Sequence, residues 1–465
     1  MSDRYSQLFA RYAATTDVAA VPETTLHEVK RRILDSIGVA TAAFTEDSPL
    51  AARTYASAFP DVNGATIWGT SQRANPEIAG FANGVAVRYL DFNDTYLSKE
   101  PLHPSDVIAA LIALAEVRGS TTEELLAAIA VAYEIPVTLC DAASLRAKGW
   151  DHVNYLAIGA AAGAGRLLGL DADRIEHAIS IATVPHAAMR QTRVGELSMW
   201  KGAAAANATR NAIFAALLAE AGMTGPNEPF EGEMGFWWQL LQGDGIEDEV
   251  LWRLRDGAPP TRVLDTYIKF WPVEYHAQSA VDAALQLRGE IGPDTSKIVS
   301  IRIDTFATSY EIIAKDPEKW DPHTRETADH SIQYIVCAAL EDGEVTMATF
   351  DLDRIRRPST LELLQHRTTV EQDDELTAGY PEGIPNRVTV TTSDGLEHVR
   401  EVRYPRGHAK NPMTDQELTH KFRTNVDVHW SDERADLVAE HVWNLEEAST
   451  LDHLLEQLRI EEGKR

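Results

Sequence analysis

Small side chains at helical spacing are the feature that most constrains the fold of this chain. The segments 154–170 (NYLAIGAAAGAGRLLGL) and 201–222 (KGAAAANATRNAIFAALLAEAG) are rich in Ala and Gly, and their larger apolar residues recur with a helical period. The segments 25–44, 75–90, 104–119 and 120–139 share that period. Helices with so few bulky side chains bury themselves by approaching each other closely. The chain up to about residue 265 is therefore predicted to be helical.

The pattern changes after residue 271. Segment 297–306 (KIVSIRIDTF) alternates and is β-branched, and 386–405 is typical of two strands joined at Asp394-Gly395, a strong hairpin signal. Segment 324–343 predicts a helix between them, and the tail returns to helical periodicity. We therefore expect a mainly α protein. Residues 1–270 with 405–465 would form a large all-helical domain, and 271–404 a smaller α/β (α+β) lid domain.

Length and composition narrow the class of protein. A chain of 465 residues favours two domains. The net charge of −28 argues against nucleic-acid binding. No run of 18 apolar residues and no secretory signal is apparent, so we expect a cytoplasmic protein without a membrane span. Cys140 and Cys337 lie in apolar runs and are expected to be buried free thiols, too few for an iron–sulfur cluster.

The segment 89–106 (YLDFNDTYLSKEPLHPSD) concentrates groups that can carry chemistry. Asp91 and Asp94 lie beside Thr95, and His103 precedes Pro104 at the predicted start of a helix. A helix N-terminus favours anions and lowers a histidine's pKa, which suits proton transfer. A capping turn is the ordinary interpretation. A metal site formed by Asp91, Asp94, His103 and His152 is a further alternative, although no metal-binding spacing fixes these residues.

Two lysines stand out because the chain holds only 11 among 43 basic residues. Lys201 is predicted in the first turn of a helix capped by Ser198, where a cation opposes the helix dipole. An anion between the ammonium group and the helix end would explain that arrangement. Lys269 lies between Ile268 and Phe270, in a similarly apolar setting. A surface lysine is the alternative interpretation of each.

Further histidines, arginines and a tyrosine are weaker candidates for the site. His186, Arg190 and Arg193 precede Lys201 and offer further cationic groups, and His276 is expected to open a helix. His330 and Tyr334 would share one helix face at i,i+4, where a hydrogen-bonded core is favoured over chemistry. No G-x-S-x-G, Walker A or G-x-G-x-x-G motif appears, so serine catalysis and nucleotide chemistry lack support.

Taken in order, these segments resemble the MmgE/PrpD family. The resemblance is carried by LDFNDTYLSKEPLHPSD, RQTRVGELSMWKG, IKFWPVEYHAQSAVDAAL, DPHTRETADHSIQYIVCAALEDG and RGHAKNPMTDQELTHKF. It implies a helical domain built from both chain ends, a smaller lid, a homodimer, and no metal or cofactor. The site residues it implies are catalytic Asp91, His103, His152, Lys201 and Lys269, with Thr95, Arg190, Arg193 and Tyr334 as substrate-binding residues.

The activity that the resemblance implies is loss of water from 2-methylcitrate, giving 2-methyl-cis-aconitate in the methylcitrate cycle of propionate catabolism. Citrate or cis-aconitate could also react. The residues fit this chemistry, because removing a proton beside a carboxylate builds negative charge that fixed cations stabilise, and the hydroxyl group needs a proton donor. His103 and His152 are the proton-transfer candidates, in either order. A cis-aconitate decarboxylase or epimerase of the family, a metal-dependent hydrolase and a silent binding module are the alternatives.

The acidic excess with few lysines predicts adaptation to high salt, as in an acidic proteome, because a dense carboxylate surface stays hydrated there. The melting temperature should rise when KCl is added to dilute buffer, since screening relieves repulsion among surface carboxylates. Thermal unfolding followed across a KCl series measures this. Greatest stability in dilute buffer would contradict the interpretation.

Overall fold

The computed structural model describes residues 3–461 and divides into two compact units. Unit 1 comprises the described residues up to Arg193, Met199–Thr266 and those from Thr414 onward. Unit 2 comprises Val194–Ser198 and Tyr267–Met413. Its main segment therefore starts earlier and ends later than the expected 271 and 404. The described chain is mainly α.

Unit 1 is built almost entirely from helices. They are α1 (Arg4–Thr15), α2 (Glu23–Ala42), α3 (Asp47–Ser57), α4 (Pro76–Tyr89), α5 (Ile108–Arg118), α6 (Thr122–Ala142), α7 (Val153–Leu167), α8 (Ala172–Thr183), α9 (Trp200–Glu220), α10 (Phe236–Leu241), α11 (Trp252–Arg255), α19 (Asp415–Val426), α20 (Asp432–Trp443) and α21 (Asp452–Gln457). The short strands β1 (Pro60–Thr66) and β2 (Arg73–Ala74) pair antiparallel, and β3 covers Asp94–Thr95.

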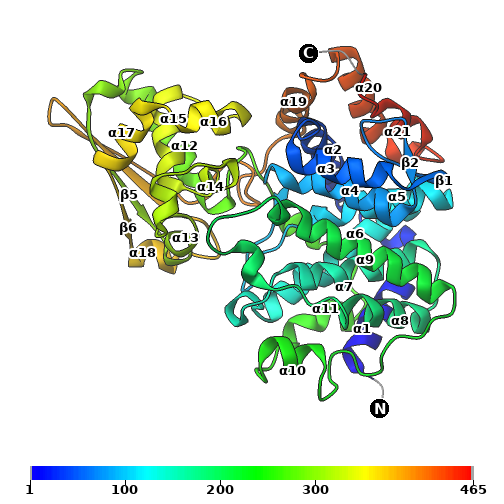
Figure 1. Ribbon diagram of the computed structural model, residues 1–465. Coiled ribbons are helices and arrows are strands. Elements are labelled where there is room, and N and C mark those ends of the chain that lie inside the picture. Colours follow the sequence, from blue (N-terminus) through cyan, green and yellow to red (C-terminus); the bar gives the residue numbers. More distant parts are fainter. Residues whose placement is uncertain (1–2, 462–465) are drawn as a thin grey trace. The chain divides into compact units, whose positions relative to one another are not determined.

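Close helix contacts in unit 1 confirm the role of the small residues. Helix α9 packs against α4, α7 and α8 (Figure 1). A Cβ added at Gly84 of α4 would lie 3.0 Å from the Ala206 Cβ of α9. One added at Gly202 would lie 3.1 Å from the Tyr89 Cα. These two contacts hold the end of α4 against the start of α9, where Lys201 lies.

Helices α6 and α7 approach each other at a defect in α6. Pro136 lies inside α6 and has no N–H to donate to the carbonyl group of Ala132. Gly159 of α7 lies against this point, and a Cβ there would be 2.6 Å from the Ala132 oxygen and from Pro136 Cδ. The sequence 154–170 thus uses glycine where a backbone approaches most closely.

Helix α6 is, among the described helices, the one long and apolar enough to cross a membrane by length and composition. The absence of an 18-residue apolar run had predicted no such helix. However, 94% of its apolar window is buried inside the protein, as in a core helix. The capping box of Thr121 and Glu124 fixes its N-terminus.

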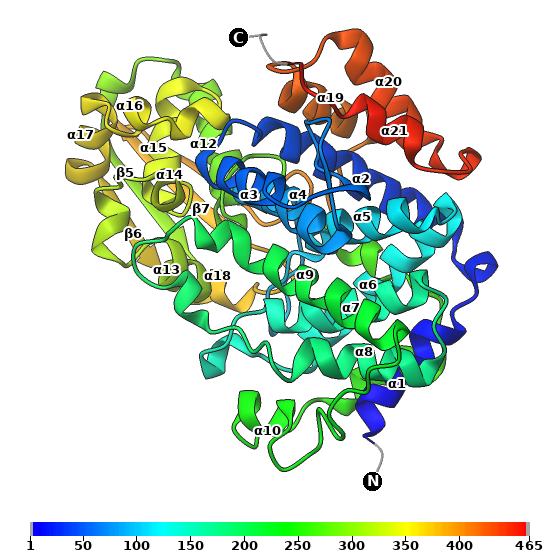
Figure 2. The same ribbon diagram turned by 45° about the vertical axis from the view of Figure 1, so that its right-hand side comes forward.

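The C-terminal helices pack within unit 1. Helix α19 lies along α2, and α20 also contacts α2 (Figure 2). Phe422 of α19 covers Gly38, where an added Cβ would be 3.0 Å from Phe422 Cδ2. Lys421 pairs with the buried Asp35 at 2.6 Å, so a buried ion pair joins helices almost 400 residues apart in sequence.

Unit 2 combines helices with a four-stranded sheet. Its elements are β4 (Tyr267–Ile268), α12 (Gln278–Ile291), β5 (Ile298–Thr305), α13 (Ala307–Ile313), α14 (Arg325–Ala328), α15 (Ile332–Asp342), α16 (Leu352–Ile355), α17 (Pro358–His366), β6 (Thr368–Gln372), α18 (Asp374–Ala378), β7 (Asn386–Thr392) and β8 (Glu397–Val402). The strand order is β6-β5-β7-β8. Strands β5 and β6 are parallel, and the other pairs are antiparallel.

The predicted strands of unit 2 are confirmed. Segment 297–306 contains β5, and 386–405 forms the β7–β8 hairpin, in which Gly395 has φ 84°. Ile298, Ile301 and Ile303 of β5 are buried, while Val299 and Arg302 are exposed. The buried side faces a core shared with α12 and α15, so one face of the sheet is covered by helices.

Three local expectations were wrong. Helix α9 starts at Trp200 with Met199 as its N-cap residue, so Ser198 does not cap it. Segment 324–343 is two helices, α14 and α15, separated at residues 329–331. Strand β6 was missed because Thr368–Gln372 is polar and shows no clear alternation. Cys140 and Cys337 are buried free thiols, as predicted.

Two glycines test the close-packing argument. Gly159→Ala should destabilise the protein by about 1–3 kcal/mol, because the new methyl group meets backbone and a proline ring. Gly289→Ala is the matched control, since nothing lies within 4 Å of its Cβ position in α12, and it should be neutral or stabilising. Denaturant unfolding followed by circular dichroism measures both; equal effects would contradict the proposed helix contact.

Candidate active site

A buried ion cluster lies where α4 meets α9. Asp91 follows α4 with φ 51°, a left-handed conformation that aspartate tolerates better than most residues. Its Oδ1 accepts a hydrogen bond from Arg88 Nη1 at 2.6 Å, and its Oδ2 accepts one from Lys201 Nζ at 3.0 Å. The three side chains are at most 2% exposed. Two cations thus share the Asp91 carboxylate inside the protein.

Asp106 adjoins the same cluster and was missed by sequence reasoning. Its Oδ2 lies 3.9 Å from Arg88 Nε, and its Oδ1 accepts a hydrogen bond from Asn93 Nδ2 at 2.9 Å. Burial raises the pKa of Asp106 to about 7, against the opposing influence of Arg88. Its carboxyl group therefore exchanges a proton near neutral pH, and the charge of the cluster changes with it.

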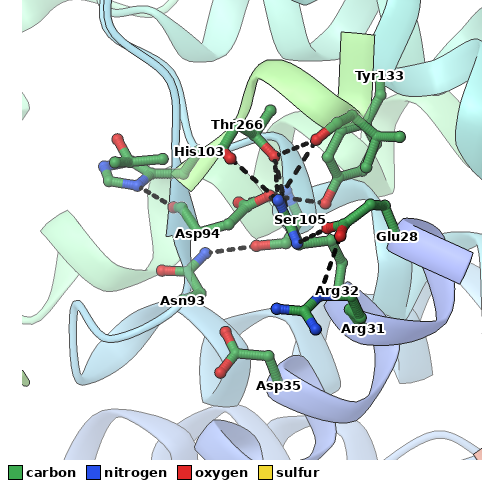
Figure 3. A network of polar contacts seen from close by, with 12 residues as sticks. Glu28, Arg31, Arg32, Asp35, Asn93, Asp94, His103, Ser105, Tyr133 and Thr266 are labelled. Carbon is green, nitrogen blue, oxygen red and sulfur yellow. Dashed lines mark hydrogen bonds and ion pairs between the residues drawn. The ribbon is translucent and has the colours of Figure 1, made fainter. Parts of the chain in front are cut away.

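Asp94 fixes the tautomer of His103 through its backbone. The Asp94 carbonyl oxygen lies 2.8 Å from His103 Nδ1, so Nδ1 carries the hydrogen and Nε2 is the basic nitrogen of the neutral ring. The Asp94 carboxylate accepts hydrogen bonds from Tyr133 Oη at 2.8 Å and from the Ser105 amide at 2.9 Å. Arg32 Nε lies 3.6 Å from it. Figure 3 shows Asp94 between His103 and this network.

Arg32 anchors the network from α2. It donates hydrogen bonds to the Thr266 carbonyl oxygen at 3.0 Å and to Glu28 at 2.6 Å (Figure 3). Burial raises the pKa of Asp94, and Arg32 opposes that rise. Asp94 is therefore a positioning residue with its oxygens already engaged, and it holds the loop that presents His103.

His152 lies beside His103, with ring centroids 5.6 Å apart. It is the N-cap residue of α7, as its place before a small-residue helix predicted. Its Nδ1 lies 3.3 Å from Asp151 Oδ1, and its Nε2 lies 3.4 Å from Arg193 Nη2. Arg193 Nε also donates to Asp151 at 3.0 Å. Because an arginine N–H faces Nε2, that nitrogen is an acceptor and the hydrogen sits on Nδ1.

Electrostatics keep His152 neutral. Burial and then Arg193 lower the pKa of His152 to about 3, despite the opposing charge of Asp151. Burial by itself would raise the pKa of Asp151, yet Arg193 and His152 lower it. His152 is thus an uncharged ring at neutral pH, whereas Arg193 remains paired with Asp151.

The 3-10 helix η2 (Pro104–Val107) joins these groups. His103 precedes it, with Pro104 in its first position as predicted. It packs against α4, α7 and α9, the helices next to Asp91, His152 and Lys201. Unit 1 therefore brings the predicted residues Asp91, His103, His152 and Lys201 together.

The structure gives less support to substrate binding by Thr95 and Arg190. Thr95 Oγ1 donates its hydrogen to the Leu102 carbonyl oxygen at 3.1 Å, so the hydroxyl group has no hydrogen left for a substrate carboxylate in this conformation. Arg190 is half-buried, and burial lowers its pKa to about 10. Its backbone amide donates to the Gly149 carbonyl oxygen at 3.0 Å, which places the residue beside the loop preceding His152.

The remaining predicted residues belong to unit 2. Lys269 follows β4 and is buried; its role stays a prediction. His276 Nδ1 lies 2.7 Å from Glu274 Oε1. Tyr334 is fully buried in the hydrophobic core, and its hydroxyl group donates to the Thr349 carbonyl oxygen at 2.6 Å. That position gives no support to substrate binding by Tyr334. It matches the other interpretation from the sequence, a hydrogen-bonded residue of the core.

The arrangement of the acidic, histidine and cysteine side chains tests whether this site could bind a metal ion. Among residues 3–461, no group of three or more His, Cys, Asp or Glu side chains is arranged to hold a metal ion. The carboxylates of Asp91 and Asp94 are engaged by Arg88, Lys201 and Tyr133. The alternative of a hydrolase with Asp91, Asp94 and His103 as metal ligands therefore gains no support from their arrangement.

The protonation of His152 can be measured directly. Its ring should stay neutral at pH 5, and Arg193→Met should raise its pKa because a neighbouring cation is removed. Unfolding frees the imidazole to bind a proton below about pH 6.5, so this residue should reduce stability as the pH falls from 6.5 toward 3. Histidine NMR titration of wild type and variant tests this; a wild-type midpoint near 6.5 would contradict it.

Comparisons with known proteins identify the family of this chain. The MmgE/PrpD N-terminal domain model matches residues 7–249, and the MmgE/PrpD C-terminal domain model matches 271–445. The chain is 33% identical to a 2-methylcitrate dehydratase of Cupriavidus necator over 396 residues, covering 78% of each chain. It is 30% identical to that of Escherichia coli K12, again over 78% of each chain.

A human protein extends the match over more of the chain. The cis-aconitate decarboxylase of Homo sapiens is 26% identical over 458 residues, covering 95% of this chain and 92% of the relative. The names of these relatives describe enzymes that remove water or carbon dioxide. The matches confirm the resemblance seen in the sequence, and the chain is an enzyme that belongs to the MmgE/PrpD family.

Proposed function

We propose that this enzyme is a hydro-lyase that eliminates water from 2-methylcitrate to give 2-methyl-cis-aconitate. The observation that carries the proposal is the buried cluster in which the Asp91 carboxylate brings the cations Arg88 and Lys201 together. Such a cluster suits a substrate with several carboxylates. The identities of 33% and 30% to named 2-methylcitrate dehydratases support this substrate class.

His103 is the group we propose for proton transfer. Its Nδ1–H donates to the Asp94 carbonyl oxygen, so its Nε2 is oriented as the base. As the C–H bond beside a carboxylate breaks, the electron pair moves onto that carboxylate, and Lys201 and Arg88 stabilise the added charge. The electron pair then forms the new double bond while the hydroxyl group leaves as water with a proton.

His152 has a different proposed role. Its pKa of about 3 leaves it unprotonated at neutral pH, so it is unsuited to donate the proton that the leaving hydroxyl needs. We propose that His152 orients substrate beside His103 as a neutral ring. The proton taken by His103 is then available for the departing hydroxyl group.

The activity assay separates the candidate reactions. Purified enzyme is incubated with 2-methylcitrate, citrate and cis-aconitate separately, while ultraviolet absorbance reports the conjugated alkene and trapped CO2 reports decarboxylation. We expect alkene formation from 2-methylcitrate, unchanged by a chelator. CO2 release from cis-aconitate without dehydration would instead identify a decarboxylase, which the 95% coverage by the human relative keeps as the second candidate.

Variants test the proposed base. His103→Ala should lower kcat for dehydration by roughly 100- to 10,000-fold, the usual contribution of a general acid–base group. His453→Ala, an exposed histidine of unit 1, is the matched control and should keep wild-type activity. Circular dichroism confirms that both variants are folded. Wild-type turnover in His103→Ala would remove His103 from the mechanism.

The family resemblance also supports a cytoplasmic homodimer with no cofactor. Light scattering coupled to gel filtration tests the oligomeric state, and activity of enzyme purified from chelator-containing buffer tests the cofactor expectation.

A further inference from the structure

Arg53 of α3 is a buried cation without a buried anion. It is 9% exposed, and its Nη1 is fully buried with no hydrogen-bond partner in the described chain. No carboxylate of residues 3–461 forms an ion pair with it. The other buried arginines described, Arg31, Arg32, Arg88 and Arg354, each pair with at least one carboxylate. Arg53 therefore lacks the carboxylate partner that the other buried arginines have, although the chain holds 71 acidic and 43 basic residues.

The side chains around Arg53 supply no negative charge. Its guanidinium carbon lies 3.8 Å from the centroid of the Phe44 ring, a cation–π contact. Burial lowers the pKa of Arg53 to about 10, with no carboxylate opposing that effect. A single aromatic ring offsets only part of the cost of removing a guanidinium from water. A bound anion would supply the missing compensation.

A small cavity adjoins the guanidinium. Arg53 lines it together with residues of α2, α4 and the C-terminal segment, including Thr41, Asn83, Leu458 and Ile460. About 10 Å³ is open to the centre of a water-sized sphere, the volume that one bound water needs. The cavity therefore admits a monatomic or similarly small ion and is too small for a tricarboxylate. It is separate from the candidate active site, whose residues do not line it.

We propose that this cavity binds one small monovalent anion, such as chloride, through Arg53. A neutral water would satisfy the Nη1 hydrogen bond but would leave the buried charge uncompensated. The C-terminal segment closes the cavity through Leu458 and Ile460, and the Ile460 amide donates to the Gly69 carbonyl oxygen at 3.1 Å. Anion binding thus stabilises the attachment of the C-terminal segment to α2–α4.

Thermal unfolding in matched sodium salts tests the site. Chloride, bromide and formate are compared with gluconate, which is too large for the cavity and sets the baseline for ionic strength. We expect Tm to rise with the logarithm of the chloride or bromide concentration above Kd, by about 3 °C at about 100 times Kd. A rise in formate would extend the site to small carboxylates, and its absence would restrict it to halides. Equal Tm in chloride and gluconate would overturn the proposal.

Arginine variants locate the effect. Arg53→Met keeps the apolar stem and should lose the chloride-specific rise in Tm. Arg73→Met is the matched control, because Arg73 already pairs with Glu116 at 2.7 Å on the surface of unit 1, and it should keep the rise. A chloride-specific rise that persists in Arg53→Met would refute the assignment to this cavity.

Crystals of the wild-type protein soaked in bromide give a test that does not depend on a variant folding. An anomalous peak within hydrogen-bond distance of Arg53 Nη1 is the expected result. A water at that position, or bromide found at surface sites only, would overturn the proposal.

Discussion

The candidate active site depends on one carboxylate shared by two buried cations. Asp91 holds Arg88 and Lys201 together at 2.6 and 3.0 Å, although neither cation would be stable in the interior by itself. The cluster lies next to the 3-10 helix that follows His103, so it brings two cations near the proposed base. Arg88 also links the cluster to Asp106, so four charged groups act as one unit.

The close approach of helices makes this cluster possible. Gly202 lets α9 pack against Tyr89 at the end of α4, and Gly84 does the same one turn away. A larger side chain at either position would move Lys201 away from Asp91. The small residues thus set the geometry of the charges as well as the density of the core. Although the net charge of the protein is −28, the cations Arg88 and Lys201 are buried.

Much of the fold could be predicted from local sequence. His103-Pro104 and His152 mark helix starts, because the signal for a helix start lies in the residues of its first turn. Asp394-Gly395 marks a hairpin, because the turn itself needs a residue in the left-handed conformation. The break at 329–331 and strand β6 could not be predicted this way. Strand β6 pairs in parallel with β5, some 70 residues away, and its own side chains carry no distinctive pattern.

For the candidate site, the sequence by itself determined the kinds of residue and the family: the scarce lysines, the histidines at 103 and 152 and the acidic loop at 89–106 all stand out along the chain. Only the tertiary structure decided their partners. It made Asp94 a support for His103, paired Arg193 with Asp151 beside a neutral His152, and put Tyr334 in the core. The reason is physical: charge and pKa depend on which groups lie within a few ångströms, and that distance is set by folding rather than by spacing in sequence.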